Sequence, residues 1–437
     1  MKSGHTELRA FRRSRAGAIV TAAWLIAPAA SAGGLFLYEF GTADVGLASA
    51  GYTARAQDAS TAFTNPAGMT RLEGTQTTLA AQVLYGDLGF SIGQGTSPGL
   101  GDRDGGNPVG WFPGGGAFLS YSVSPDLKLG FATTGNFGLS ASYSADWAGR
   151  YYVQEPTLVG LSMVPSVAYR VSPQWSVGAG LNMMYAKMRT QVAINNVLGD
   201  DGELVLSDYQ WGIGGNVGVL YEPSQGTRFG FVWTSPVKLD FSAPPRFSNI
   251  SPLLETALRN RGIYDADIDI GITVPQGVDA SFFHQIDPRW ALLGSVGWQQ
   301  WSRFGQVEVG IDSPDPSTLT KEMDFKDTWH AALGAQYQLD SRWRLDFGIA
   351  YDSEFQDNAK VSPMLPSNSA WRFGLGVNRQ ESRSFNWGVA AEYAYGGTLD
   401  VNQLSELPVA LGGRGDLVGS YENTGVFFMS ANFNWKF

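Results

Sequence analysis

The sequence is short of cysteine, histidine and charge, and each shortage excludes a class of function. With no cysteine in 437 residues, disulfide bonds, thiol catalysis and zinc sites built on cysteine are impossible. Three histidines, at positions 5, 284 and 330, are too few for a histidine-rich metal site, and we expect neither a metal nor a cofactor. The net charge of −10 gives nucleic-acid binding no electrostatic basis.

Long hydrophobic runs are missing as well. Beyond the N-terminal region no stretch of about 18 apolar residues occurs, which excludes a helical membrane protein. Charged residues make up 16% of the chain, against about 25% in soluble domains, whereas aromatic residues reach 13% and glycine occupies 55 positions. This composition is typical of a transmembrane β-barrel, whose strands alternate between lipid-facing and lumen-facing residues.

The N-terminus has the features of a secretory signal. Basic residues between positions 2 and 15 precede an apolar stretch over 16–26, and Ala30, Ser31 and Ala32 fit a cleavage site for small residues. We expect a signal peptide over 1–32. The alternative, an uncleaved anchor, has an apolar stretch too short to span a bilayer.

Residues 75–437 alternate in character over short runs, which predicts an all-β fold with 14 antiparallel strands. Six short polar turns alternate with seven longer connections, as in barrels with short periplasmic turns and long external loops. The expected localisation is therefore the Gram-negative outer membrane. The strands are expected at about 75–90, 115–123, 127–143, 159–171, 175–191, 206–221, 228–242, 267–286, 290–305, 327–339, 343–354, 369–379, 384–400 and 420–437.

The last strand has one aromatic-rich face and one polar face, and the chain ends at Phe437. A terminal aromatic strand resembles the signal by which the barrel-assembly machinery recognises its clients, although an ordinary amphipathic strand would share the alternation. Residues 33–74 are instead rich in glycine and alanine, too small-sided for a lipid-facing strand, and we expect them to fold inside the lumen as a plug.

That segment also carries a family resemblance. The run from Gly51 to Met69, with Asp58-Ala59-Ser60-Thr61 followed by Asn65-Pro66-Ala67-Gly68, resembles the N-terminal hatch of the FadL/TodX family. Further similar stretches occur in order at 129–139, 147–151, 165–170, 298–304, 348–352 and 371–376. The resemblance implies a monomeric 14-stranded barrel, a hatch in its lumen and passive uptake of hydrophobic substrates. Asn65 and Pro66 themselves predict a turn in the hatch.

Asn136, Phe137 and Gly138 interrupt the third expected strand, and a glycine within a strand marks a bulge or kink. The family carries a kink here that opens the wall sideways, so we expect substrate to leave laterally at this point. The alternative is a bulge without a transport role.

Substrate capture is expected in the external loops. Residues 251–262 predict a short helix with Ser251 as N-cap, Pro252 at its first position and Gly262 after its end. Leu253, Leu254, Ala257 and Leu258 share one face, which could bind a hydrophobic ligand or pack on neighbouring loops.

Four basic residues in the strands are candidates for a carboxylate head group. A charge on the lipid face at mid-depth costs about 2–4 kcal/mol, so Lys187, Arg189, Arg344 and Arg372 are expected to face the lumen. There they could anchor a substrate carboxylate, or bond to lumen acids such as Asp346 and to the hatch.

The expected ligand is thus a long-chain fatty acid or another hydrophobic molecule, met in a membrane that contains lipopolysaccharide. A channel selective for aromatic hydrocarbons, a polar porin and a surface adhesin or phage receptor remain as alternatives. An enzyme is not expected, because His284 and His330 have no Gly-x-Ser-x-Gly motif to accompany them.

Overall fold

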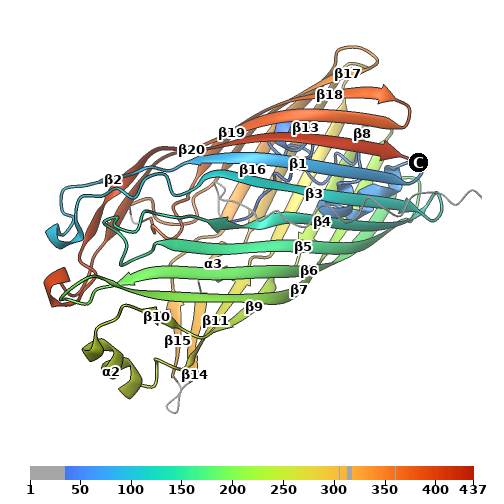
Figure 1. Ribbon diagram of the computed structural model, residues 1–437. Coiled ribbons are helices and arrows are strands. Elements are labelled where there is room, and N and C mark those ends of the chain that lie inside the picture. The colour runs from blue at the N-terminus through green and yellow to red at the C-terminus, as the bar shows by residue number, and fades with distance from the viewer. Residues whose placement is uncertain (1–34, 305, 313–316, 360) are drawn as a thin grey trace, which may run out of the picture.

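A computed structural model describes residues 35–304, 306–312, 317–359 and 361–437, and its strands close into an antiparallel barrel (Figure 1). The expected signal peptide, residues 1–32, lies outside the described residues. The barrel closes because β1 pairs with β3 on one side and with β20 on the other. Its 14 strands, in order, are β1 (Gln76–Asp87), β3 (Gly110–Ser122), β4 (Leu127–Ser140), β5 (Glu155–Arg170), β6 (Trp175–Ile194), β7 (Gly202–Ser224), β8 (Thr227–Thr234), β12 (Gly277–Gln285), β13 (Trp290–Gln299), β16 (Thr328–Gln338), β17 (Trp343–Asp352), β18 (Ala370–Ser382), β19 (Phe385–Gln403) and β20 (Leu417–Lys436).

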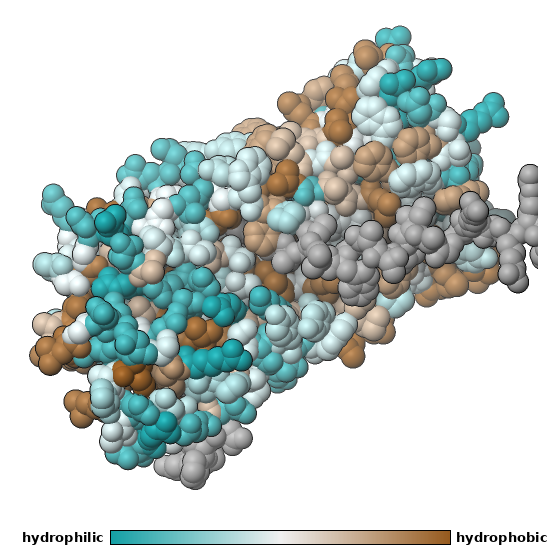
Figure 2. Space-filling view, in the orientation of Figure 1, coloured by the Kyte–Doolittle hydropathy of each residue, from teal (hydrophilic) through white to brown (hydrophobic). Residues whose placement is uncertain are grey.

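The alternation of side chains decides which face of each strand meets lipid. On β18, Trp371, Phe373 and Leu375 are exposed on the outer surface, whereas the intervening residues are buried. Figure 2 shows hydrophobic residues over the barrel wall, and hydrophilic residues gathered at the end that carries the long connections. This division is that of a barrel embedded in a membrane.

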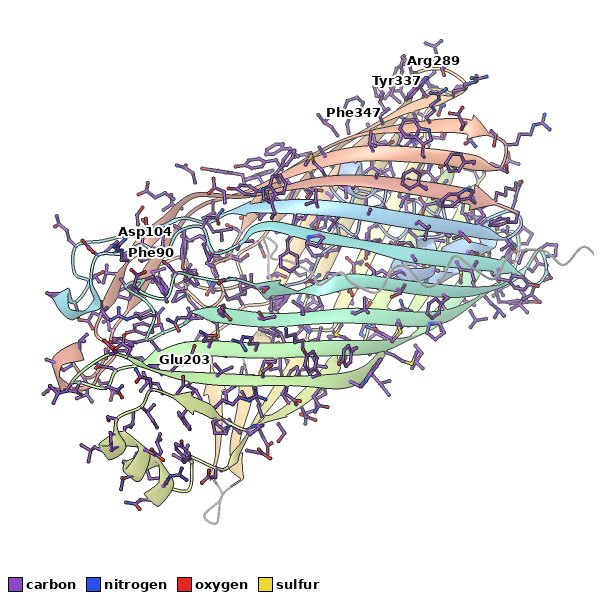
Figure 3. The ribbon with its side chains drawn as sticks, viewed as in Figure 1. Phe90, Asp104, Glu203, Arg289, Tyr337 and Phe347 are labelled. Atoms are coloured by element: carbon purple, nitrogen blue, oxygen red, sulfur yellow. The ribbon has the colours of Figure 1, made fainter. Side chains whose placement is uncertain are left out.

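Two belts of outward-facing aromatic side chains lie at the two edges of the lipid-facing wall. Trp175 and Tyr185 lie ten residues apart on β6, and Trp343 and Tyr351 lie eight apart on β17. At about 3.3 Å per residue and a tilt of about 40°, these spacings correspond to about 20–25 Å along the barrel axis, the height of an outer-membrane apolar band. Tyr337 belongs to the belt at the end with short turns, where it points away from the wall (Figure 3).

Two of the expected strands are not continuous. The segment 228–242 divides into β8 and β9 (Val237–Ala243), and 267–286 divides into β11 (Asp267–Val274) and β12. Pro236 and Pro275 stand at the breaks, where a residue without an amide proton cannot continue a ladder. Beyond the breaks, β9 and β11 join β14 (Gln306–Asp312) and β15 (Ser317–Glu322) in a separate four-stranded sheet beside α2 (Pro252–Asn260; Figure 1). The expected strand 290–305 likewise ends at Gln299, and α3 (Trp301–Phe304) follows it.

The remaining short elements lie in the connections. Strands β2 (Phe90–Ile92) and β10 (Arg246–Ser248) extend the barrel sheet at the long-loop end, where η3 (Pro98–Leu100) and η4 (Val409–Leu411) also lie. Among the described residues, no helix is long and apolar enough to cross a membrane.

The N-terminal segment fills the lumen, as the expected hatch would. It contains η1 (Val45–Leu47), α1 (Thr61–Thr64) and η2 (Pro66–Arg71), and almost every residue from 35 to 70 is buried. Inside it, Arg55 forms ion pairs with Asp44 at 3.2 Å and Asp58 at 2.7 Å. Asn65 is the N-cap of η2, since its side chain accepts a hydrogen bond from the amide of Ala67 at 3.1 Å.

Glycines of the wall let the hatch lie directly against the strands. A Cβ atom at Gly348 would lie 2.0 Å from the carbonyl of Leu47, and one at Gly230 would lie 2.1 Å from that of Thr53. Since no side chain fits at these points, part of the glycine content follows from the contact between hatch and wall.

Candidate functional site

The wall of the barrel has a gap in its hydrogen bonding between β3 and β4. These strands pair from Ser122 opposite Lys128 to Gly116 opposite Thr134, and within the described residues the ladder ends there. Beyond Gly116 and Thr134, toward the long-loop end, β3 still pairs with β1 as far as Gly110, and β4 pairs with β5 as far as Ser140. Between Gly116 and the backbone hydrogen bond that Ser142 donates to the carbonyl of Pro108, at 2.8 Å, the described residues of these two neighbouring strands are not joined by a backbone ladder.

The bulge predicted at 136–138 is present on β4 beside this gap. The register with β5 shifts between Gly135 and Phe137, so Asn136 is the extra residue of a β-bulge. Gly138 has a φ of +137°, and a Cβ atom there would lie 2.3 Å from the carbonyl oxygen of Leu158. Only glycine adopts this conformation without strain, which explains why the motif ends in Gly138.

The start of the described chain lies against the unpaired edge of β4. The amide of Leu37 donates to the carbonyl of Asn136 at 2.9 Å, and the amide of Gly138 donates to that of Leu35 at 2.7 Å. Phe36 and Phe137 form the bridge between these two bonds. Because β5 occupies the other edge of β4 here, residues 35–37 take the edge that β3 has left.

An apolar cluster fills the lumen behind the gap. Leu35, Phe137 and Leu139 pack in it with side chains of α3, β6 and β9. The ring centroids of Phe137 and Phe304 are 6.2 Å apart. Next to this cluster, a small pocket of about 30 Å³ is lined mainly by apolar side chains that include Leu35 and Leu139. Such surroundings suit a hydrocarbon chain.

On the periplasmic side, by contrast, basic residues of the wall hold the hatch by its backbone. Arg228 donates to the carbonyls of Ala54, at 2.6 Å, and Arg55, and its guanidinium stacks on Phe283 at 3.6 Å. Lys128 donates to the carbonyl of Leu72 at 3.0 Å, and Arg170 to that of Thr70. Sequence reasoning missed these three cations, because no pattern indicates which hatch carbonyls they meet.

The prediction that Lys187 and Arg189 face the lumen is wrong. On β6 the inward row is Met184, Ala186 and Met188, which pack in the apolar cluster. Lys187 lies outside, 5.8 Å from the ring of Tyr209, and Arg189 pairs with Glu155 at 3.0 Å. Both cations lie above the outer aromatic belt, where head groups and water solvate them, so the cost of a charge at mid-depth does not apply.

Arg344 and Arg372 do face inward, and both bind protein carboxylates. Arg344 pairs with Asp346 at 2.9 Å near the periplasmic turn. Arg372 is fully buried and bonds to Asp352 at 2.5 Å, to Glu392 at 3.0 Å and to Glu39 of the N-terminal segment. These two residues were expected to bind either a substrate carboxylate or acids of the lumen and the hatch. In the structure both form ion pairs with protein carboxylates.

The helix predicted over 251–262 is confirmed as α2, with Ser251 as its N-cap and Pro252 at its first position. Leu253 is 83% exposed, Ala257 is also exposed, and Leu254 and Leu258 are half-buried. The helix lies at the long-loop end of the molecule, apart from the gap (Figure 1).

Four other loops border an open cleft of about 620 Å³ at the same end. Val197, Val409 and Tyr151 line it, and Arg150 pairs with Asp201 at 2.7 Å beside them. Burial raises the pKa of Tyr151 to about 12, and its hydrogen bond to Asp201 adds to the shift. The cleft combines apolar and hydrogen-bonding groups and was not foreseen from the sequence.

Solved structures with the same architecture include a FadL homologue of Pseudomonas aeruginosa, with a TM-score of 0.80 at 19% identity over 92% of this chain and all of that one. The toluene transporter TodX of P. putida gives a TM-score of 0.66 at 14% identity over 90% of this chain and 99% of that one. At these identities the likeness concerns the fold.

Sequence relatives point the same way. The long-chain fatty acid transport protein of Escherichia coli K12 is 27% identical over 88% of this chain and 93% of its own. Outer membrane protein P1 of Haemophilus influenzae Rd is 26% identical over 86% of this chain and 88% of its own. The name of the H. influenzae relative, an outer membrane protein, and the closed barrel confirm the predicted localisation.

The model of one family of transport proteins, described as outer membrane protein transport protein (OMPP1/FadL/TodX), matches residues 23–437. Because the matched family consists of transport proteins, the match also confirms the prediction that the chain is not an enzyme. With nearly its whole length matched and its architecture shared, the chain belongs to the OMPP1/FadL/TodX family of outer-membrane transport proteins.

Proposed function

We propose that this protein carries hydrophobic molecules across the outer part of the outer membrane and releases them sideways between β3 and β4. The observation that supports the proposal most directly is that residues 35–37 occupy the β4 edge that β3 has left. Release would require this short segment to detach, which breaks the two backbone hydrogen bonds between residues 35–37 and β4 and uncovers the buried side chains of Leu35 and Leu37.

The contacts of the hatch favour this route over one through the periplasmic end. Arg228, Lys128 and Arg170 bond to hatch carbonyls there, and wall glycines contact the hatch backbone directly. Moving the whole hatch would leave several buried groups without partners, at about 1–3 kcal/mol each. Displacing residues 35–37 leaves the contacts of these three cations with the hatch in place.

Capture would start at the loops, on the exposed face of α2 or in the cleft lined by Val197 and Val409. Exposed apolar side chains such as Leu253 and Leu198 offer a surface that water wets poorly. From there the apolar cluster behind the gap continues the path.

A disulfide across the covering bridge tests the route. Phe36 and Phe137 face each other between two backbone hydrogen bonds, the arrangement with close Cα atoms that a disulfide can span. Since the chain has no cysteine, Phe36→Cys/Phe137→Cys forms a single possible pair. We expect oxidation to stop uptake in cells and reduction to restore it.

The matched control is Leu333→Cys/Ile349→Cys, which joins an outward pair in the intact ladder of β16 and β17. Its oxidation should leave uptake unchanged. Uptake that continued with the 36–137 disulfide closed would disprove lateral release past this segment.

The substrate class is tested with radiolabelled long-chain fatty acid and labelled toluene, in cells with and without the protein. Faster entry of the fatty acid alone would favour a lipid substrate, as in the E. coli relative's name, and faster entry of toluene alone would favour a hydrocarbon. No change in either would remove the transport proposal for both ligands.

A further inference from the structure

Three cations lie on the outer face of the wall, above the aromatic belt at the long-loop end. Lys187 and Arg189 are successive outward residues of β6, whose inward row packs in the apolar cluster. Arg246 of β10 is exposed and pairs with Val205 of β7. The residues on either side of Val205 pack against the apolar cluster, so Val205 and Arg246 face outward as well. We call Lys187, Arg189 and Arg246 the basic patch; their strands lie together in Figure 1.

The register of the sheet sets the spacing within the basic patch. Lys187 and Arg189 are two residues apart along β6, or about 7 Å between their Cα atoms. Gln191, the next outward residue, pairs with Val205, which pairs with Arg246. Arg246 is therefore two strands across the sheet from Gln191, which places it about 12 Å from Arg189. At this spacing the patch can bind two separate anionic groups.

Two of the three cations have no carboxylate partner within the part of the chain that the structure describes. Arg189 pairs with Glu155 at 3.0 Å, but neither Lys187 nor Arg246 forms an ion pair with a described residue. Glu203, the other acid on this face, accepts a hydrogen bond from a serine hydroxyl of β10 at 3.1 Å (Figure 3). The patch thus has cations left to bind an anion from outside the protein.

Other strands carry the opposite charge at the same end. In the halves of β1, β19 and β20 nearer the long loops, the exposed charged residues are Asp87, Asp400 and Glu422. Asp87 follows Tyr85 of the aromatic belt by one outward position, as Lys187 follows Tyr185 on β6. An anion at the membrane surface is therefore attracted to the wall at β6 and β7 and repelled at β1 and β20.

An apolar surface lies on the wall directly below the basic patch. The ring of Tyr185 lies 5.8 Å from that of Tyr209 and 4.9 Å from that of Trp211, measured between centroids. Ile213 is exposed and continues this surface toward the middle of the wall. Tyrosine and tryptophan belts lie at the level of lipid head groups, so the cations above them meet the head groups and the apolar surface below meets acyl chains.

We propose that the basic patch binds the phosphates of an outer-leaflet lipid whose acyl chains lie on Trp211 and Ile213. The lipid anchor of lipopolysaccharide, lipid A, has this chemistry, since it is an acylated disaccharide with a phosphate at each end. Lys187 and Arg189 bind one phosphate and Arg246 binds the other, because guanidinium groups match the geometry of phosphate oxygens. The site is separate from the transport route and does not depend on which substrate is carried.

The test measures the binding of two lipids to the purified full-length protein by native mass spectrometry in a nonionic detergent. The lipids are diphosphoryl and monophosphoryl lipid A with the same acyl chains. EDTA is present, because divalent cations could link a phosphate to the exposed acids of other strands. One more contact between phosphate and cation should make the diphosphoryl form bind about fivefold more tightly.

The double variant Lys187→Gln/Arg246→Gln should weaken the binding of diphosphoryl lipid A about 25-fold, about fivefold for each charge removed. The matched control Arg289→Gln/Arg342→Gln removes two exposed cations from the short turns at the other end of the barrel and should bind as the wild type does. Lys187→Arg/Arg246→Lys keeps both charges and should retain most of the affinity. Heat-dependent migration on SDS gels verifies that each variant forms a folded barrel.

Four outcomes would overturn the proposal. The wild type might bind neither lipid, or bind both equally, or the double variant might keep the wild-type affinity. An equal loss of affinity in the control would show a general effect of net charge in place of a site. In a further arm, inorganic phosphate is added to the complex with diphosphoryl lipid A. Retention of the lipid is expected, because its acyl chains also contribute to binding, whereas displacement would assign the patch to free phosphate and overturn the assignment to a lipid.

Discussion

Phe36 lies directly opposite Phe137, and this pair forms the backbone bridge between the N-terminal segment and the bulged edge of β4. The hatch therefore does two things in the described chain. Most of it packs deep in the lumen, and its first residues complete the wall at the point where β3 and β4 separate. The gap and its cover come from segments a hundred residues apart in sequence.

Replacing Gly138 by valine should reduce uptake at least about tenfold while the barrel still assembles, because the β-branched side chain cannot adopt the φ of +137° and the bulge must straighten. Uptake of labelled substrate measures the first effect, and heat-dependent gel migration the second. Gly89→Val is the control, since that glycine has open space around it and no positive φ. Normal uptake by Gly138→Val would refute a role for the kink.

Arg372→Met should lower the stability of the folded protein by about 3–5 kcal/mol, because Asp352, Glu39 and Glu392 lose their shared cation in a buried site. The midpoint of urea unfolding in detergent measures it. Arg344→Met, whose partner Asp346 also binds Asn378, should cost less. A stable Arg372→Met protein that lost fatty-acid uptake alone would instead support the head-group role for Arg372.

Arg228→Met should loosen the hatch, because the carbonyls of Ala54 and Arg55 each lose a charged donor. We expect transient ion currents in planar bilayers that the wild type lacks, together with faster amide exchange in residues 54–72. Arg289→Met, on an exposed turn (Figure 3), is the control and should behave as wild type. Currents equal to those of the wild type would argue that the glycine contacts alone hold the hatch.

Deleting Phe437 should reduce the amount of assembled barrel in the outer membrane several-fold without altering the stability of the molecules that do assemble. The side chain is 78% exposed, so its loss removes little packing, although its amide bonds to the carbonyl of Thr75 at 2.8 Å. Quantifying folded and unfolded protein in cells checks this. Phe437→Tyr, which keeps an aromatic end, should assemble normally, and equal assembly of the deletion would remove the signal role.

The strand count and the bulge could be predicted because alternation, polar turns and glycine act locally along the chain. Breaks at Pro236 and Pro275 were missed because both lie inside runs that still alternate, so the periodicity concealed them. For Lys187, alternation separates the two faces of the strand but does not say which face points into the lumen. The face that carries Met184 and Met188 is the inward one. The pocket between hatch and wall could not be predicted, because Asn136, Asn182 and Asn216 line it together only when three strands curve around the hatch.

The contact between Leu47 and Gly348 constrains how such proteins can change over time. Where the backbone of the plug contacts the backbone of the wall, a glycine in one partner is required by the position of the other. A plug exchanged between two relatives would meet side chains at positions where it needs glycine, and it would be strained or displaced. Plug and wall are therefore expected to have diverged as a matched pair, whereas the loops and the lipid-facing surface were free to vary independently.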